Sequence, residues 1–369
     1  MSREARRIGY VGTLDPGGTC YARLEALRGV EPHVEALDTD AFLRRGSRVA
    51  RWLGHLPVVG AGPRRLNAAV LRFAREARLD FLWIDKGDWV EPGTLRALRA
   101  AGVRLVHHVT DALWPQPLRL RLTRRRLAGT ATLYDCHLTS NGADFRRLEE
   151  AMPGRVLLTQ LGYDERRFHA RPEVDRAAAA RWTNDAVFVG HWEPRTERGL
   201  AALVRAGVRV KIFGRAWLAR ARRNPELAGC VADGLSDRDY ERALKHALVG
   251  LCFVSEWNYN ETAGRSYEIP ASGTFLLAPR TREHQRDYRE GEEAEFFGGE
   301  AELVAKVRRY LNDDERRRAV ARRGWRRCTT SGYSWREIML RDWARVTAVL
   351  QAGHPGAAQA AAGAKDRSG

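Results

Sequence analysis

The sequence predicts an α/β protein built from two open parallel sheets. Short runs such as 81–85 (FLWID) and Val249–Val254 are almost continuously apolar, as are strands covered on both faces. They alternate with segments of helical character over roughly the first 160 residues, which is the pattern of a parallel sheet. The same alternation restarts at Val187–Gly190 without a detectable sequence repeat. Two open α/β domains are therefore expected.

The first half begins with a strand (Arg7–Val11), a glycine-bearing turn (Gly12–Thr19) and a helix (Thr19–Leu27). Free backbone N–H groups at such a helix start can bind an anion, although a plain tight turn explains the pattern equally well. The turn lacks the GxGxxG spacing of dinucleotide sites. Either interpretation supports a Rossmann-like start. The candidate binding residues here are Gly17, Gly18 and Thr19.

A second strand (His33–Leu37) leads into Asp38-Thr39-Asp40, which matches the DxD pattern of some metal-dependent enzymes. Short acidic residues at the start of a helix also accept hydrogen bonds from its unpaired N–H groups. We expect Asp38 or Asp40 to cap the following helix, and we predict no metal site.

Polar residues gather where the next two strands end. Helices at Arg64–Arg78 and Thr94–Ala101 precede and follow FLWIDKG, and VRLVHHVTDALW supplies the next strand and its end. Carboxyl ends of parallel strands collect ligands. Helix capping and structural histidines are the alternatives to a functional role. The residues concerned are Lys86, Asp88, His107, His108 and Asp111.

The second half repeats this arrangement. Strands at Val187–Gly190 and Val208–Gly214 flank a helix at Glu197–Ala206. Gly190 ends a strand, where a ligand can approach the backbone closely. The polar residues that follow these strands are His191, Arg195, Arg198 and Arg215.

The stretch from Val249 to Pro279 carries the strongest signal. It contains a buried strand (Val249–Val254), a polar loop, a short helix and a second strand (Thr274–Ala278). The loop must lie at the carboxyl edge of the sheet, so it predicts a site for a polyhydroxylated, anionic ligand. Its polar residues are Glu256, Asn258, Asn260, Glu261 and Thr262, and those of the helix are Arg265, Ser266 and Glu268.

The composition narrows the alternatives. The formal charge of +17 comes mainly from Arg, and runs such as 313–327 mix acids with bases at helical spacing, which indicates solvated helix faces rather than a nucleic-acid site. The segment Arg119–Arg126 (RLRLTRRR) could rest on an anionic membrane surface, but a solvated helix face is the favoured interpretation there as well. Five dispersed cysteines, no CxxC pair and no apolar run of membrane-spanning length predict a cytoplasmic protein.

The segment RSYEIPASGTFLLAP resembles the donor-site signature of GT-B glycosyltransferases, in the form seen in the spore-maturation CgeB-like branch of group 1 enzymes. The segments TSNGADFRRL, GYDERRFH and YREGEEAEFFGGEAELVAKVRRYL are similar to that branch as well. The resemblance implies that Glu268 binds the nucleotide ribose. Group 1 enzymes often carry another Glu eight residues earlier, where this chain has Asn260, with Glu261 one step away.

The resemblance also implies a domain plan. Residues 1–165 would form a Rossmann-like acceptor domain and residues 166–333 a Rossmann-like donor domain, the two facing a cleft. Residues 334–351 would form a helix that crosses back to the first domain, because Trp335, Ile338, Trp343 and Val346 recur at helical spacing. A low-complexity tail at 352–369 is expected to be mobile.

The resemblance finally implies a chemistry: transfer of a sugar from a UDP-, GDP- or TDP-sugar to an unidentified acceptor, without a metal ion or another cofactor. Arg265 and one of Arg195 and Arg198 would stabilise the leaving diphosphate. Asp111, or alternatively His108, would act as general base if the configuration inverts. A non-catalytic nucleotide-sugar-binding protein, an epimerase and a phosphorylase remain alternatives.

Overall fold

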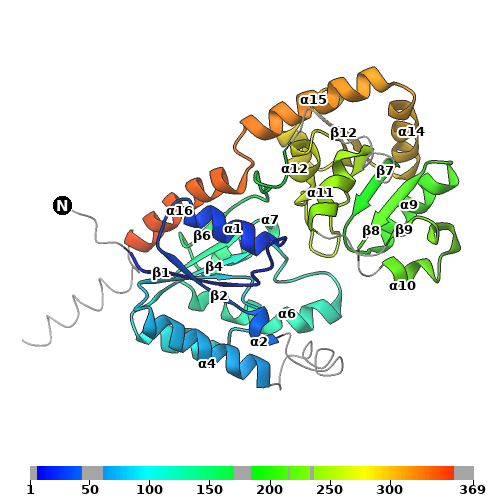
Figure 1. Cartoon of the computed structure of the whole chain (residues 1–369). Helices are drawn as coiled ribbons and strands as arrows, with labels where there is room; N and C mark the ends of the chain where they lie inside the picture. The colour runs from blue at the N-terminus through cyan, green and yellow to red at the C-terminus, as the bar shows by residue number, and fades with distance from the viewer. Residues whose placement is uncertain (1–5, 44–60, 170–183, 215–216, 233–236, 353–369) are drawn as a thin grey trace, which may run out of the picture. The chain divides into compact units, whose positions relative to one another are not determined.

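The computed structural model describes residues 6–43, 61–169, 184–214, 217–232 and 237–352. The chain divides into two units, each with its own sheet (Figure 1). Among the described residues, the first unit holds those up to Gln160, the short loop Trp257–Tyr259 and the last helix from Arg336. The second unit holds Leu161–Glu256 and Asn260–Trp335.

The first unit contains a six-stranded parallel sheet of order β2-β1-β3-β4-β5-β6. Its strands are β1 (Ile8–Gly12), β2 (Val34–Asp38), β3 (Phe81–Asp85), β4 (Arg104–Val109), β5 (Cys136–Thr139) and β6 (Val156–Leu158). Its helices are α1 (Thr19–Arg28), α2 (Asp40–Leu43), α4 (Ala61–Glu76), α5 (Pro92–Ala100), α6 (Leu118–Thr130), the 3-10 turn η1 (Ala131–Leu133), α7 (Gly142–Ala151) and α16 (Trp335–Ala352).

Strand β3 shows how this sheet is covered on both faces. Leu82 and Ile84 pack into the apolar cluster that α4 contributes to. Because successive side chains of a strand alternate between faces, Trp83 points the other way and lies 6.4 Å, ring to ring, from Trp343 of α16. The indole N–H of Trp343 donates to Oε1 of Glu31 at 2.8 Å. The last helix therefore packs on the first sheet, as the sequence predicted.

The second unit contains another six-stranded parallel sheet, of order β12-β11-β10-β7-β8-β9. Its strands are β7 (Asn184–Val189), β8 (Val210–Phe213), β9 (Val231–Ala232), β10 (Ala247–Leu251), β11 (Phe275–Pro279) and β12 (Glu295–Phe297). Its helices are α9 (Pro194–Arg205), α10 (Trp217–Ala221), the turn η2 (Pro225–Leu227), α11 (Asp237–Lys245), α12 (Arg265–Ala271), α13 (Arg282–Asp287), α14 (Glu300–Leu311) and α15 (Asp314–Thr330).

The order of the second sheet is that of a Rossmann fold, and it reverses between β7 and β10. Ligands of such sheets bind at the carboxyl ends of the strands beside the reversal. Gly250 in β10 allows α12 to approach the sheet, because a Cβ atom there would lie 2.4 Å from the Ile269 side chain. The two Rossmann-like domains expected from the sequence are therefore present.

Three helices begin earlier than the sequence suggested, and one of them, α4, starts at Ala61 instead of Arg64. Helix α9 starts at Pro194 and α5 at Pro92, not at Glu197 and Thr94. Proline suits the first turn of a helix, because the N–H that it lacks would have no helical partner there. The two boundaries therefore follow from the proline positions.

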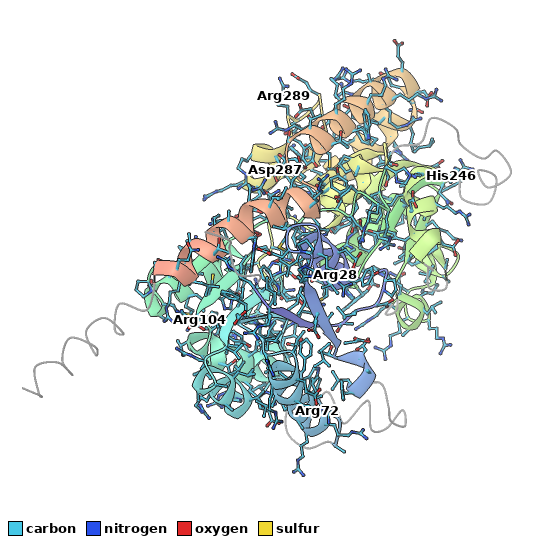
Figure 2. The ribbon with its side chains drawn as sticks, turned by 60° about the vertical axis from the view of Figure 1, so that its left-hand side comes forward. Arg28, Arg72, Arg104, His246, Asp287 and Arg289 are labelled. Atoms are coloured by element: carbon cyan, nitrogen blue, oxygen red, sulfur yellow. The ribbon has the colours of Figure 1, made fainter. Side chains whose placement is uncertain are left out.

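The arginines are distributed over many elements. Arg28, Arg72, Arg104 and Arg289 are exposed on α1, α4, β4 and the loop before β12, whereas Asp287 is buried (Figure 2). This scatter agrees with the interpretation of the arginines as solvated surface groups. No helix in the described part of the chain is long and apolar enough to cross a membrane.

Candidate functional site

Helix α12 joins β10 to β11 and carries the strongest sequence signature. It is seven residues long and includes Pro270, which has no N–H to donate to the carbonyl of Ser266 one turn earlier. The hydroxyl of Tyr288 donates to that carbonyl instead, at 2.9 Å. The helix is therefore completed by a tyrosine from outside it, and its position in the unit is fixed.

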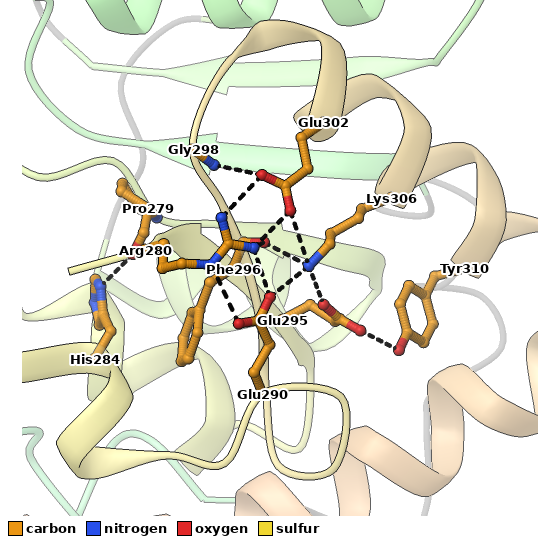
Figure 3. A network of polar contacts seen from close by, with 10 residues as sticks. All are labelled: Pro279, Arg280, His284, Glu290, Glu295, Phe296, Gly298, Glu302, Lys306 and Tyr310. Atoms are coloured by element: carbon orange, nitrogen blue, oxygen red, sulfur yellow. Dashed lines mark hydrogen bonds and ion pairs between the residues drawn. The ribbon is translucent and has the colours of Figure 1, made fainter. Parts of the chain in front are cut away.

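Ser266 supports the helix from inside. Its side chain is fully buried, and its Oγ accepts from the N–H of Ala263 at 3.0 Å. The ring of His284 bridges Ser266 Oγ and the carbonyl of Pro279, both at 2.8 Å; Figure 3 shows the bond to Pro279. Because a carbonyl only accepts, Nδ1 of His284 donates and Ser266 donates to Nε2. Ser266, predicted to contact a ligand, is thus occupied in holding α12.

Glu268 lies one turn into α12 and is only 8% exposed. Its Oε2 accepts a hydrogen bond from the hydroxyl of Tyr240 in α11, and its Oε1 lies beside Gly264, where a Cβ atom would be 3.3 Å away. Burial raises the pKa of the Glu268 carboxyl, and the neighbouring Arg265 and Tyr240 oppose only part of the rise. A carboxylate fixed in this way can accept hydrogen bonds from ligand hydroxyl groups.

Arg265 begins the helix beside Glu268 and is half-buried. Burial alone would lower the pKa of its guanidinium, but Tyr240 and Glu268 raise it above its usual value. Its Nε atom is shielded from solvent and has no hydrogen-bond partner among the described residues. The Nε–H of Arg265 is thus a buried donor that the described residues leave unsatisfied.

The loop before α12 is ordered by other contacts. Glu193, buried at the start of α9, accepts from the Ser255 hydroxyl at 2.5 Å and from the N–H of Glu256 at 3.0 Å. The backbone N–H of Asn260 donates to Ser255 at 3.0 Å. The exposed Glu261 accepts from the N–H of Glu283 at 3.2 Å, and no ion pair between Glu261 and Arg265 occurs in the described part of the chain.

The ends of β7 and β8 meet closely. A Cβ atom on Gly214 would lie 2.2 Å from the carbonyl oxygen of Gly190, which also accepts from the indole of Trp217 at 3.0 Å. The missing side chain at Gly214 therefore allows close backbone packing against Gly190 at the strand ends. His191 is exposed just after it, and Arg215 lies outside the described residues.

Arg195 and Arg198 border a pocket of about 320 Å³ near the carboxyl edge of the second sheet. Gly298 and Gly299, which lead into α14, form part of its wall. Each arginine has an acidic partner: Arg195 pairs with Glu256 at 2.6 Å, and Arg198 with Glu300 at 3.2 Å. An anion that binds them must compete with these exposed ion pairs, which are individually weak.

A network of charged groups braces the end of β11 (Figure 3). Arg280 lies 2.7 Å from Glu290 and 2.5 Å from Glu302, and Lys306 lies 2.6 Å from Glu290. Hydrogen bonds from Arg280 lower the pKa of Glu302 to about 2. These ion pairs join the end of β11 to α14.

In the first unit, Arg124 contacts two of the predicted strand-end residues, Asp88 and Asp111. From the sequence, this arginine was expected on a solvated helix face. Arg124 of α6 lies 3.0 Å from Asp88 and 3.2 Å from Asp111, whose side chains are each 37% exposed. Burial raises the pKa of Asp88. Lys86 lies in the left-handed region with φ +65°, a strained conformation that often occurs at functional sites.

The other residues near these strand ends are buried. Arg23 holds Asp85 through two bonds, of 2.7 and 2.8 Å, and although burial alone would raise the pKa of Asp85, Arg23 keeps it well below its usual range. His108 is 2% exposed and its Nδ1 lies 3.9 Å from Asp85. Burial lowers the pKa of His108. His107 is fully buried against His137. Of the two predicted bases, only Asp111 is open to solvent.

The remaining predicted residues lie near the ends of β1 and β2. Gly18 and Thr19 form the start of α1, and the N–H of Gly18 donates to the carbonyl of Asp15 at 2.7 Å. Gly17 precedes them in the same turn. Asp38 accepts from the N–H of Asp40 at 3.0 Å, at the start of α2. Within the described ranges, no three His, Cys, Asp or Glu residues are grouped to hold a metal ion.

Sequence reasoning missed two residues of these sites. Tyr240 lies on α11 close to the buried Ala243 and Leu244, and Arg124 lies one turn from the buried Leu127. Helical spacing relative to those apolar positions would have placed both side chains on inward faces. Their partners, Glu268 and the Asp88–Asp111 pair, could not be identified from spacing alone.

Comparison with known proteins agrees with this architecture. HepE (Alr3699) of Anabaena, solved with UDP and glucose, shares 13% identity over 92% of this chain and 99% of its own, with a TM-score of 0.65. Sucrose-phosphate synthase of Thermosynechococcus elongatus shares 15% over 94% and 100%, with a TM-score of 0.67. A glycosyltransferase of Rickettsia africae shares 9% over 95% and 100%, with a TM-score of 0.65.

At such identities the likeness shows the fold alone. No curated protein sequence matches the chain. Residues 195–341, from α9 into α16, match the family model described as glycosyl transferase-like. The chain therefore has the GT-B fold of two Rossmann-like domains, and its segment 195–341 is glycosyltransferase-like in sequence.

Proposed function

We propose that this protein is a metal-independent glycosyltransferase, of the CgeB-like branch of group 1, that uses a nucleotide-sugar donor. The observation that carries the proposal is the Glu268 carboxylate, held by Tyr240 beside Arg265 at the carboxyl edge of a sheet with Rossmann strand order. HepE, which has a similar fold, was solved with UDP and glucose, and this favours a UDP-sugar among the candidate donors.

In this proposal each residue of the second unit has a distinct task. Glu268 accepts hydrogen bonds from the ribose hydroxyls, and Arg265 stabilises the diphosphate as its charge grows during bond cleavage. Arg195 or Arg198 contributes a second guanidinium to the phosphates. Tyr240 and Ser266 act as positioning residues. Asn260 and Glu261 lie in the loop proposed to meet the donor sugar.

The proposed acceptor domain, residues 1–165 together with the returning helix, would bind the acceptor in the cytoplasm. If the reaction inverts the anomeric configuration, Asp111 removes the proton from the acceptor hydroxyl, since its carboxylate is accessible and that of Asp85 is not. Lys86 and Asp88 would orient the acceptor. If the configuration is retained, no such base is required.

Helix α6 offers a surface that could contact a membrane holding the acceptor. Leu118 and Leu122 are 69% and 57% exposed, and Arg121 and Arg125 are exposed on the same face at helical spacing. Such a face suits an anionic bilayer surface. Co-sedimentation with phosphatidylglycerol vesicles but not with phosphatidylcholine vesicles, reduced in Leu118→Ser/Leu122→Ser, is expected.

Calorimetry with UDP-, GDP- and TDP-sugars tests the donor proposal. One donor should bind, and Glu268→Ala should weaken it at least tenfold, because hydrogen bonds to a charged group contribute about 1.5–3 kcal/mol each. Glu226→Ala, an exposed glutamate on η2, is the matched control. Unchanged affinity in Glu268→Ala would contradict the assignment. Slow hydrolysis of the bound donor distinguishes a transferase from a non-catalytic binding protein.

A further inference from the structure

A second concavity lies at the opposite edge of the first sheet, where strands begin. It has a volume of about 620 Å³, within the range of roughly 300–1,000 Å³ that is typical of small-molecule sites. The last turns of α4 and α5 and the residues leading into β1, β3 and β4 form its walls. None of the residues proposed above for sugar transfer lines it.

The inner part of this groove is apolar. Leu79, Leu98 and Val103 line it, are buried in the first unit's core, and belong to one apolar cluster. The wall is open at Gly102, where a Cβ atom would meet nothing within 4 Å. An aliphatic group could therefore lie between the ends of α4 and α5 without displacing the core.

The rim of the groove is cationic. Arg7 pairs with Asp80 at 3.2 Å, so its charge is largely balanced. Arg75 and Arg78 are exposed on the rim, and no ion pair or side-chain hydrogen bond of theirs occurs among the described residues. The carbonyls of the α4 end are already used, because Leu79 and Arg78 donate to Ala74 and Arg75 at 3.0 and 3.2 Å. Two guanidinium groups thus remain for an anion.

Arg78 occupies an unusual conformation for its position. Its φ is +48°, at the end of a helix where glycine is normally favoured. The ends of α5 and α9 have glycine at such positions, Gly102 and Gly207, with φ of +85° and +80°. Backbone strain kept for the sake of a side chain indicates that the side chain has a task.

We propose that this groove binds an amphipathic organic anion, with its aliphatic part between α4 and α5 and its charged group at Arg75 and Arg78. The proposal does not depend on the sugar-transfer function. Octyl phosphate is a suitable probe, measured by calorimetry below its micelle concentration. Inorganic phosphate lacks the aliphatic part and octyl glucoside lacks the charge, so both should bind at least tenfold more weakly.

The variant Arg78→Gly tests whether the guanidinium of Arg78 binds the anion. Glycine removes the guanidinium and relieves the strained φ, so the melting temperature should be unchanged or higher while octyl phosphate binds at least tenfold more weakly. Arg72→Ala, on the same helix but outside the groove, is the matched control and should bind normally (Figure 2). The proposal is overturned if octyl phosphate does not bind, if either comparison compound binds as tightly, or if Arg78→Gly binds as well as Arg72→Ala.

Discussion

The hydroxyl group of Tyr240 in α11 donates a hydrogen bond to Oε2 of Glu268 in α12. Burial raises the pKa of Tyr240 well above its usual value, so the tyrosine keeps the proton that it donates. The bond favours the ionised form of a carboxyl group whose pKa burial raises. It also orients the carboxylate, whose other oxygen lies beside Gly264.

Removing this hydroxyl should change how donor binding depends on pH. In the proposed site, ribose hydroxyls donate to the ionised form of Glu268, so affinity should be lost as pH falls through the raised pKa of this residue. Tyr240→Phe raises that pKa further, so the loss should begin at higher pH. Calorimetry with UDP over a pH series checks this, with Tyr310→Phe as a control whose hydroxyl serves Glu295. Superimposable profiles for wild type and Tyr240→Phe would contradict it.

The sequence predicted the fold because parallel strands and crossover helices leave strong local patterns. The apolar runs of β3, β10 and β11, and the spacing of Trp335, Ile338 and Trp343, required no long-range information. Those patterns also located the carboxyl edge of each sheet, and so the neighbourhood of Glu268.

The partners of individual side chains were not predictable in this way. The sequence predicts that Ser266 contacts a ligand, yet its hydroxyl donates a hydrogen bond to His284, which is 18 residues away in sequence. The sequence also does not distinguish exposed residues at strand ends from buried ones. Asp111 is partly exposed and His108 is buried, although both follow or end the same strand. Only packing in three dimensions separates a group that holds the scaffold from one that remains free for a ligand.

The buried His284 should make the second unit sensitive to acid. Burial lowers its pKa from 6.5 to about 4, and the hydrogen bond that its Nε2 accepts from Ser266 requires the neutral ring. For a histidine with a lowered folded pKa, the stabilisation is complete above pH of about 6.5 and is lost as pH falls toward 4, by about 3 kcal/mol in total. Imidazole ¹⁵N spectra should show a neutral ring with the proton on Nδ1 between these pH values. A protonated ring just below pH 6.5 would contradict this.

Asp111→Asn tests the general base. If the enzyme inverts, this variant should lose about 10²- to 10⁴-fold in kcat and keep its affinity for UDP, because the amide cannot accept the acceptor's proton. Asp314→Asn is the matched control, since Asp314 is an exposed aspartate on α15 that also pairs with an arginine and lies outside the proposed sites. Equal turnover in wild type and Asp111→Asn would exclude Asp111 as the base and favour a retaining reaction.

Transfer is expected to continue in EDTA. Arg265, Arg195 and Arg198 can supply the positive charge that a metal ion supplies in other sugar transferases. The initial rate should be the same with EDTA, Mg²⁺ or Mn²⁺. Loss of the rate in EDTA and its return with either metal would contradict metal independence and draw attention to Asp38 and Asp40.

The last prediction concerns Arg265, whose Nε is shielded from solvent and has no hydrogen-bond partner in the described structure. If its guanidinium stabilises the leaving diphosphate, its effect grows toward the transition state, so Arg265→Ala should lower kcat more than it raises KM. A loss of about 10²-fold or more is expected from removing such a donor. Arg265→Lys keeps the charge without the planar fork and should recover only part of that loss.

The competing explanation is that Arg265 only holds Glu268 and Tyr240 in place. In that case Arg265→Ala would lower the melting temperature, and UDP affinity and kcat would fall together. Measuring melting temperature, UDP affinity and kcat on the same variants separates the two, with Arg205→Ala as a control because that exposed arginine pairs only with Glu226 among the described residues. A stable Arg265→Ala with normal kcat would end the diphosphate assignment. A stable variant whose kcat falls more than its UDP affinity would leave phosphate stabilisation as the explanation, because a role confined to holding Glu268 and Tyr240 would lower both together.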